Sequence, residues 1–321
     1  MFQINQWSIY LFLLGAINST CEFREKGRGG SQMQKLSVIV LEKMIKANVT
    51  SKEIDFLLYI ARFQNEYGII KGIYYRDIMD YIHVSHQTFY DCKKSLEEKG
   101  IIECVKNSYY DWDIVILDNN FKGKENYGRG YVSLHNDMVR SIEFMELKAG
   151  AKLMALWLMR EWLIYRKKTG SNSYQINKQT LLRKFTELMH ISSRVIRRYL
   201  GMLTPWISIY LEKGEKYYIT FQKNAVIAPG SDSENGELRE HDIRVGCRRN
   251  RIKDIGNREK KDLITVLTQH NKQIEKLFDF SLSDIIHKSL EIINQSVKDK
   301  HRWKRLVNVP LIHKVLIQEL G

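Results

Sequence analysis

The feature that most constrains this fold is an internal repeat with a shift of 107 residues, the distance from His83 to His190. At that shift His83-Val84-Ser85 falls on His190-Ile191-Ser192. The apolar positions keep the same register: Ile78 with Phe185, Tyr81 with Leu188, Ile82 with Met189, Phe89 with Ile196, Cys92 with Tyr199 and Leu96 with Leu203. A solenoid needs three or more copies. We therefore expect one duplicated unit, with copies over 33–125 and 126–227.

The first copy contains signals for three helices and a hairpin. Thr50 and Glu53 form a capping-box pattern ahead of apolar residues at helical spacing. The segment 74–84 predicts a second, short helix. Ser85 can cap a third helix over 86–99, and Gly100 suits the left-handed position that closes it. The segment 101–117 then predicts two strands around an Asn-Ser turn.

The second copy repeats these signals around a longer first helix, predicted over 147–168. A short helix follows from Asn177, and the segment 206–221 predicts a hairpin that turns at 213–215. The long helix is apolar on every side between residues 153 and 159, but charged residues interrupt it, so it predicts a buried helix and not a bilayer span. We expect Trp157 in the core and leave Trp162 open between core and an interface.

Three short helices followed by a two-stranded hairpin resemble the winged helix-turn-helix fold. This resemblance implies a mainly α protein with small β-hairpin wings (α+β), built from two winged helix-turn-helix units plus a C-terminal helical segment. It implies double-stranded DNA as the partner, although units of this kind also serve as protein-interaction modules.

The third helix of each copy has an outer face opposite its apolar edge. In the first copy this face carries Gln87, Tyr90, Asp91 and Lys94, and in the second copy the matching positions are Arg194, Arg197, Arg198 and Gly201. Arg pairs with guanine edges and Gln with adenine in the major groove, and both also reach phosphates. Solvated arginines are the competing interpretation. Asp91 counts against the first copy because a carboxylate repels phosphate, so we expect the second copy to bind more strongly.

Further DNA contacts are expected from turns and from a basic run. The candidates are Lys106, Asn107, Tyr109 and Tyr110 in the first hairpin, Lys213 and Lys216 in the second, and Arg248 and Arg249 in the run that also holds Arg251 and Lys253. Lysine and arginine there can neutralise phosphates. Asp111 and Asp113 share one side of a strand, and we expect them to be solvated charges and not a metal pair.

The two ends of the chain differ from its middle. The segment 27–33, GRGGSQM, can be encoded by a purine-rich ribosome-binding site, so we expect either a mis-annotated start with translation from Met33 or a tail over 1–32. The segment 228–261 is polar, turn-rich and then basic, and is expected to be a linker. Amphipathic stretches over 262–321 predict a C-terminal helical bundle, a candidate surface for a homodimer or a partner protein.

Charge and motifs narrow the class of function. The formal net charge is +14, with a pI near 9.4, which favours a polyanionic partner. The four cysteines have no zinc-ligand spacing, and we find no nucleotide-binding, nucleophile or metal-ligand motif. We therefore expect no enzyme, no cofactor, no metal and no membrane association, and a cytoplasmic, nucleoid-associated protein.

Three functions fit these expectations. The first is a transcriptional regulator that binds duplex DNA through its two winged-helix units. The second is a plasmid or mobile-element replication initiator that binds origin repeats, a class that this chain resembles in architecture only. The third is a winged-helix protein-interaction module.

Overall fold

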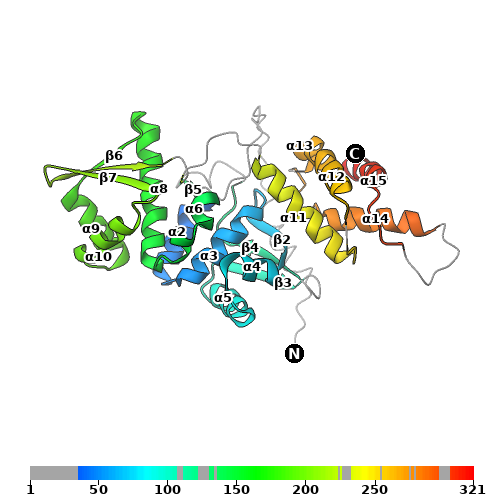
Figure 1. Ribbon diagram of the computed structural model, residues 1–321, viewed down its shortest axis with the longest axis horizontal. Helices are drawn as coiled ribbons and strands as arrows, with labels where there is room; N and C mark the ends of the chain where they lie inside the picture. The colour runs from blue at the N-terminus through cyan, green and yellow to red at the C-terminus, as the bar shows by residue number, and fades with distance from the viewer. Residues whose placement is uncertain are drawn as a thin grey trace, which may run out of the picture. The chain divides into compact units, whose positions relative to one another are not determined.

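The computed structural model describes residues 35–106, 111–121, 130–133, 136–222, 225, 233–253, 255–274, 276–277, 280–295 and 304–321. This part of the chain is mostly helical with small antiparallel sheets (Figure 1). Residues 31–321 group into one compact unit. The expected tail over 1–32 lies outside the described residues. No helix in the described ranges is long and apolar enough to cross a membrane.

The first repeat contains the three helices and the two-stranded hairpin that we predicted, together with one strand that we did not predict. Its elements are α3 (Ser51–Ile60), η1 (Ala61–Phe63), β2 (Ile69–Tyr74), α4 (Tyr75–Ile82), α5 (His86–Glu98), β3 (Ile102–Lys106) and β4 (Asp111–Ile116). The strands pair antiparallel in the order β2-β4-β3. The unpredicted strand is β2, although its run of isoleucines followed by tyrosine is a typical strand signal. The hairpin turn, 107–110, lies outside the described residues.

The second repeat has the same order of elements. They are α8 (Ala149–Thr169), β6 (Tyr174–Asn177), α9 (Lys178–Met189), α10 (Ser193–Met202), β7 (Ile207–Glu212) and β8 (Lys216–Phe221). Its strands pair in the order β6-β8-β7, which matches β2-β4-β3 of the first repeat. In both segments a strand therefore follows the first helix and pairs with the last strand of the hairpin.

Local caps explain where the helices start and stop. Thr50 and Glu53 form the predicted capping box of α3. The Ser85 hydroxyl accepts a hydrogen bond from the Thr88 amide, and Ser192 accepts one from Val195, so both third helices begin at a serine cap. His83 and His190 end the preceding helices in the left-handed conformation, with φ of 52° and 54°. Both histidines thus form the turn that leads into the third helix of their repeat.

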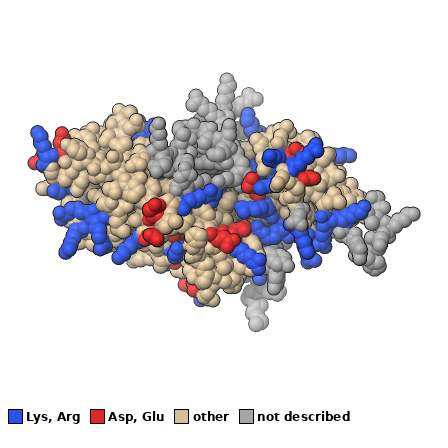
Figure 2. Space-filling view, in the orientation of Figure 1, with Lys and Arg blue, Asp and Glu red and all other residues tan. Residues whose placement is uncertain are grey.

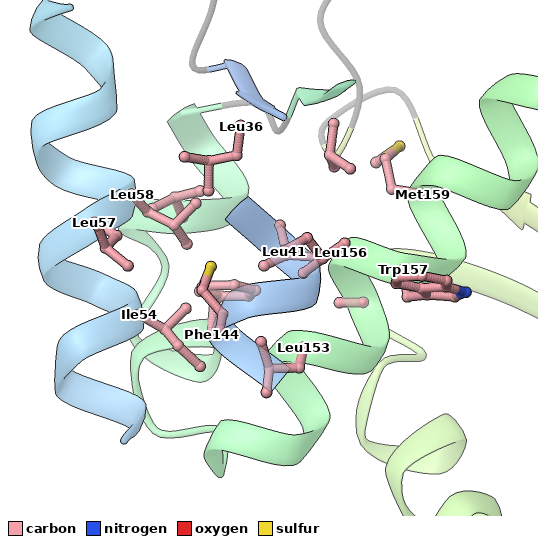
Figure 3. Packing of buried hydrophobic residues seen from close by; sticks show 14 of the residues in the cluster. Leu36, Leu41, Ile54, Leu57, Leu58, Phe144, Leu153, Leu156, Trp157 and Met159 are labelled. Atoms are coloured by element: carbon pink, nitrogen blue, oxygen red, sulfur yellow. The ribbon is translucent and has the colours of Figure 1, made fainter. Parts of the chain in front are cut away.

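One hydrophobic core contains residues of both repeats. At its centre α2 (Val38–Lys46) lies between α3 and α8, and Figure 3 shows Leu41 of α2 facing the side of α8 that carries Leu153 and Leu156. Trp157 and Trp162 are both buried, which confirms the expectation for Trp157 and settles Trp162 as a core residue. The two repeats are therefore packed together and are not tethered by a flexible joint.

Two short strands and two short helices also contribute residues to this core. β1 (Lys35–Ser37) pairs antiparallel with β5 (Tyr131–Ser133), so the start of the described chain joins the segment that connects the repeats. Two short helices, α6 (Asn136–Arg140) and α7 (Ile142–Met145), follow β5 and lead into α8. Phe144 of α7 is fully buried.

A buried ion pair crosses the contact between the repeats. Lys152 of α8 donates to the Asp55 carboxylate of α3 at 2.5 Å, and their side chains are 0% and 2% exposed. The Lys152 ammonium also donates to the Met145 carbonyl and lies over the Phe144 ring. Burial raises the pKa of Asp55 and lowers the pKa of Lys152, while the charge of each partner opposes the shift of the other.

The C-terminal part has a core of its own. Its helices are α11 (Ser233–Arg249), α12 (Asn257–Gln269), α13 (Asn271–Ile274), α14 (Leu282–Gln295) and α15 (Val309–Leu320). Helix α11 occupies half of the segment 228–261, where we expected a linker, and it supplies Ile243 and Cys247 to this core. The helical bundle therefore begins with α11 and not at residue 262.

The opposite side of α11 packs on the first repeat. The His241 ring stacks on Phe63 with centroids 4.2 Å apart, and its Nε2 donates to the Lys71 carbonyl of β2 at 2.8 Å. Gly72 has a φ of +69°, and a Cβ added there would clash with a methyl group of Val245. Glycine at this position therefore permits the close approach of α11 to β2.

Candidate nucleic-acid interface

Helix α10 holds the most concentrated set of candidate residues. Ile196, Tyr199 and Leu200 are buried and fix the helix on the core. Arg194, Arg197 and Arg198 lie on the remaining surface, and all three are exposed, as the helical spacing predicted. The arrangement therefore places three guanidinium groups on one helix face in the first two turns.

These three positive charges are not neutralised by neighbours. The helix contains no acidic residue, and the structure gives none of the three arginines an ion pair among the described residues. Arg197 Nε donates to the Ser193 carbonyl of its own helix, and the Arg198 guanidinium lies 5.7 Å from the Tyr199 ring centroid. Figure 2 shows Lys and Arg gathered over α9 and α10 on the face that it draws.

The second hairpin adds one exposed lysine. Lys213 lies in the turn between β7 and β8, in the left-handed conformation with φ of 45°. Lys216 is half-buried at the start of β8, opposite Glu212 in the strand register, and its ammonium lies 5.3 Å from the Tyr218 ring centroid. Of the two predicted lysines, Lys213 is thus the one presented to solvent without an acidic register partner.

The matching face of α5 in the first repeat is internally paired. The Gln87 amide donates to the Asp91 carboxylate at 2.8 Å. Lys94 forms an exposed pair with Glu98 at 3.8 Å. Asp91 therefore orients Gln87, and Lys94 has an acidic partner one turn away, so this face offers much less unbalanced positive charge than α10.

Two other candidates of the first repeat lie against the rings of neighbouring side chains. Tyr90 is half-buried against the rings of His86 and Phe89, with centroids 4.8 and 5.0 Å away. Lys106 is exposed at the end of β3, with its ammonium 5.8 Å from the Trp112 ring centroid. Asn107, Tyr109 and Tyr110 lie outside the described residues.

Sequence reasoning missed Lys93, which links α5 to the hairpin. Its side chain is 10% exposed, its ammonium donates to Glu97 at 2.7 Å and it lies 4.2 Å from the Trp112 ring centroid. The i,i+4 spacing of Lys93 and Glu97 was a usable signal, although nothing in the sequence indicated the ring. Lys93 therefore holds the helix in place and is not part of its outer face.

Arg248 and Arg249 do not lie on a free basic segment. Arg249 donates to both Asp111 and Asp113 of β4, at 2.9 and 2.6 Å, and Arg248 contacts Asp77 at 3.4 Å and the face of the Tyr74 ring. The expectation of solvated carboxylates at Asp111 and Asp113 is therefore wrong, because α11 brings a guanidinium onto the strand. These contacts hold α11 against the first repeat.

The described part of the chain offers no candidate metal site beside these basic residues. It places no cluster of three or more His, Cys, Asp or Glu side chains that could hold a metal ion. In comparisons with known proteins, no family model matches this chain, and neither a curated protein nor a solved structure matches it. Helix α10 and its surroundings are therefore the candidate site.

Proposed function

We propose that this protein binds duplex DNA and acts as a transcriptional regulator, with two winged helix-turn-helix units that present α5 and α10 as their third helices. Both units have the same order of helix, strand, two helices and hairpin, with the third strand between the other two, and this shared order supports the proposal. In a winged unit the third helix enters the major groove and the hairpin reaches the neighbouring backbone.

The observation that carries the proposal is the face of α10. Arg194, Arg197 and Arg198 are exposed together on a helix without acidic residues. This helix is third in its repeat, the position that winged helix-turn-helix proteins use for recognition. Alternating charge along a helix face is typical of a solvated surface, and Lys94 and Glu98 form such a pair on α5. A face of arginine alone is matched to phosphates and to guanine edges, which accept two hydrogen bonds from one guanidinium.

The three arginines have different roles in this proposal. Arg194 lies nearest the start of α10, and the first turns of a recognition helix reach base edges. Arg197 and Arg198 lie one turn further along and suit phosphates beside the groove. Lys213 of the hairpin supplies another phosphate contact. The α5 face, with Gln87 held by Asp91, contributes less binding energy.

The two alternatives from the sequence make different demands on the same surfaces. A replication initiator would use α10 in the same way on origin repeats, so only the position of its sites separates it from a regulator. A protein-interaction module would not require α10 to bind DNA at all. The paired charges of α5 make the first repeat the better candidate for a protein contact.

Single substitutions test the proposal once a preferred duplex has been selected from a random pool. Arg194→Ala should cost about 1–3 kcal/mol on that duplex and relax its preference at one position, because a base contact is lost. Arg198→Ala should weaken the selected and a scrambled duplex about equally. Gln87→Ala should have a smaller effect than either arginine change. Binding is measured by fluorescence anisotropy, with circular dichroism as the check on folding.

Arg258 provides the matched control. Its side chain is 92% exposed on α12, so Arg258→Ala removes one arginine from the chain without touching α10. If Arg194→Ala and Arg198→Ala fold and bind as tightly as Arg258→Ala, then α10 does not contact DNA. The protein-interaction hypothesis would then replace this proposal.

A further inference from the structure

Strand β7 is an edge strand of the sheet in the second repeat. No strand in the described ranges pairs with the side of β7 that faces away from β8. The sequence of β7 is Ile-Ser-Ile-Tyr-Leu-Glu, with no proline and no basic residue, and its register with β8 is unbroken over all 6 residues. A long, regular edge strand of this composition is a ready template for pairing with another chain.

The first repeat protects both edges of its sheet. Edge strand β3 ends in Lys106, and its Cys104 amide donates to the Glu97 carboxylate of α5 at 3.1 Å. The other edge strand, β2, has a shift in its register, and α11 covers it through the bond from His241 to the Lys71 carbonyl. Lysine, bulges and covering helices are the devices that block pairing at an edge. In the described part of the chain, β7 has no lysine, no bulge and no covering bond of this kind.

The backbone of β7 directs hydrogen-bonding groups outward at alternate residues. The Gln222 amide donates to the Trp206 carbonyl, in register with the ladder between β7 and β8, so these two residues form a hydrogen-bonded pair at its end. Such pairs alternate with non-hydrogen-bonded pairs along antiparallel strands. Tyr210 is therefore bonded to β8, whereas Ile209 and Leu211 direct their N–H and C=O groups to the free edge.

We propose that β7 pairs antiparallel with β7 of a second copy of this chain and joins the two sheets into one. The strand is complementary to itself when Tyr210 lies opposite Tyr210 of the second copy. Ile209 then lies opposite Leu211 of the second copy, so the outward N–H and C=O groups of both residues are paired. Their side chains lie on the half-buried inner face, which therefore stays apolar across the new strand pair.

Tyr210 lies at the centre of the proposed contact. It is 64% exposed on the outer face of the sheet, and its ring centroid lies 6.1 Å from that of Tyr218 on β8. Opposite the same tyrosine of the second copy it forms an aromatic cross-strand pair, and such pairs stabilise antiparallel strands. On the same face Ser208 lies opposite Glu212 of the second copy, so each carboxylate meets a hydroxyl donor and no like charges face each other.

Pairing of the same surface on both copies gives a two-fold dimer, the commonest form of homo-oligomer. One strand from each copy makes a small contact, so we expect a dissociation constant on the order of micromolar. The dimer does not depend on whether α10 binds DNA. If the proposed function also holds, the dimer presents two copies of α10 about a two-fold axis, which matches an inverted repeat in the duplex.

Sedimentation velocity of the full chain without DNA tests the dimer, at protein concentrations from about 1 to 100 μM. The parent should shift from monomer to dimer over this range. Tyr210→Lys and Tyr210→Glu should each weaken the dimer at least about tenfold, because like charges then lie directly opposite. An equimolar mixture of these two variants should restore a dimer, because opposite charges then meet at the two-fold axis.

Val105→Lys is the matched control. Val105 is an exposed apolar residue of β3, the corresponding edge strand of the first repeat, so this change adds the same charge and should leave the dimer unaffected. Circular dichroism checks the folding of every variant.

Four results would overturn the proposal. A parent that stays monomeric at the highest concentration excludes the dimer. A folded Tyr210→Lys variant that dimerises as strongly as the parent places the contact elsewhere, for example on the C-terminal helices. Equal weakening by Val105→Lys means that added charge alone is responsible. Failure of the mixed variants to form a dimer excludes the register with Tyr210 at the axis. Normal DNA binding by the α10 variants would contradict the proposed function and leave this dimer standing.

Discussion

Lys152 and Asp55 are the two most deeply buried charges that meet across the repeats, and neither has access to water. Two charges removed from water are costly, and their mutual attraction offsets that cost only while both are present. The Met145 carbonyl satisfies a further proton of the ammonium. The pair therefore stabilises one particular packing of α3 against α8 more than it stabilises the fold in general.

Removing one partner should be much worse than removing both. Lys152→Met is expected to lower the free energy of unfolding by about 3–5 kcal/mol, because Asp55 is left buried without a counter-charge. Combining it with Asp55→Leu should recover a large part of that loss. Urea unfolding of both variants and the parent measures the difference. A double variant that is less stable than Lys152→Met would show that the aspartate has a partner other than the lysine.

At the scale of elements, helix caps and hairpins were predictable because their signals are local. Ser85, Ser192 and Gly100 each specify a helix end within a few residues of sequence. The face of α10 was predictable for the same reason, since 3.6-residue spacing alone separates Ile196 from the arginines. The pairing of Gln87 with Asp91 is also local, because the two residues are four positions apart on one helix. The sequence could therefore have predicted that Asp91 orients Gln87 on the outer face of α5.

Helix α11 was not predictable in this way. It buries Leu238 and Val245 toward the first repeat and Ile243 and Cys247 toward the second core, so its apolar residues do not form one stripe. Polar neighbours then make the segment resemble a linker. Its anchoring contacts depend on partners far away in the chain, since Arg249 lies 138 residues from Asp111. No local pattern carries that information.

The contact of α11 with the first repeat should be sensitive to acid through His241. Complete burial, together with the nearby charges of Arg244, Arg248 and Arg249, lowers the pKa of His241 to about 3, against the opposing effect of its bond to the Lys71 carbonyl. In the unfolded chain the pKa returns to its ordinary value of 6.5. Between these values the unfolded chain binds a proton that the folded protein does not, so stability is lost as the pH falls.

The free energy of unfolding should fall by about 1.4 kcal/mol for each pH unit below 6.5. Above that pH, the stabilisation that comes from the neutral His241 is fully present. Urea unfolding between pH 7.5 and pH 4.5 measures it. His241→Gln keeps a hydrogen-bond donor but does not titrate. The free energy of unfolding of this variant should therefore fall less on acidification than that of the parent, and the difference should equal that loss. Equal pH dependence of the parent and this variant would mean that His241 is not held neutral in the fold.

For the whole molecule, the excess of basic residues is distributed unevenly among the parts. Arg248 and Arg249 of α11 are paired with carboxylates, and Lys93 and Lys94 of α5 with glutamates, while the arginines of α10 are not. A net charge of +14 can attract a polyanion over a distance, but only unpaired groups at the contact release counterions from DNA. The location of charge thus matters more than its sum.

Salt dependence should reveal this distribution. The logarithm of the duplex binding constant should fall linearly with the logarithm of salt concentration, with a slope near −0.9 for each phosphate neutralised. Arg197→Ala and Arg198→Ala should each make that slope shallower by about 1, whereas Lys94→Ala should change it less because Glu98 already pairs with that lysine. Anisotropy titrations from 50 to 300 mM salt give the slopes. Identical slopes for all variants would exclude the α10 arginines from the phosphate contacts.

The shared core has a consequence for any DNA that both third helices contact. Because α3 and α8 pack against each other, the separation of α5 from α10 is set when the chain folds and not by the length of a tether. B-DNA turns once in about 10 base pairs, so five inserted base pairs carry one contacted sequence to the opposite side of the duplex. A protein with jointed domains could follow that change, whereas under the proposed function we expect this one not to follow it. The natural target would then be defined as much by the phase between its two sequence elements as by the elements themselves.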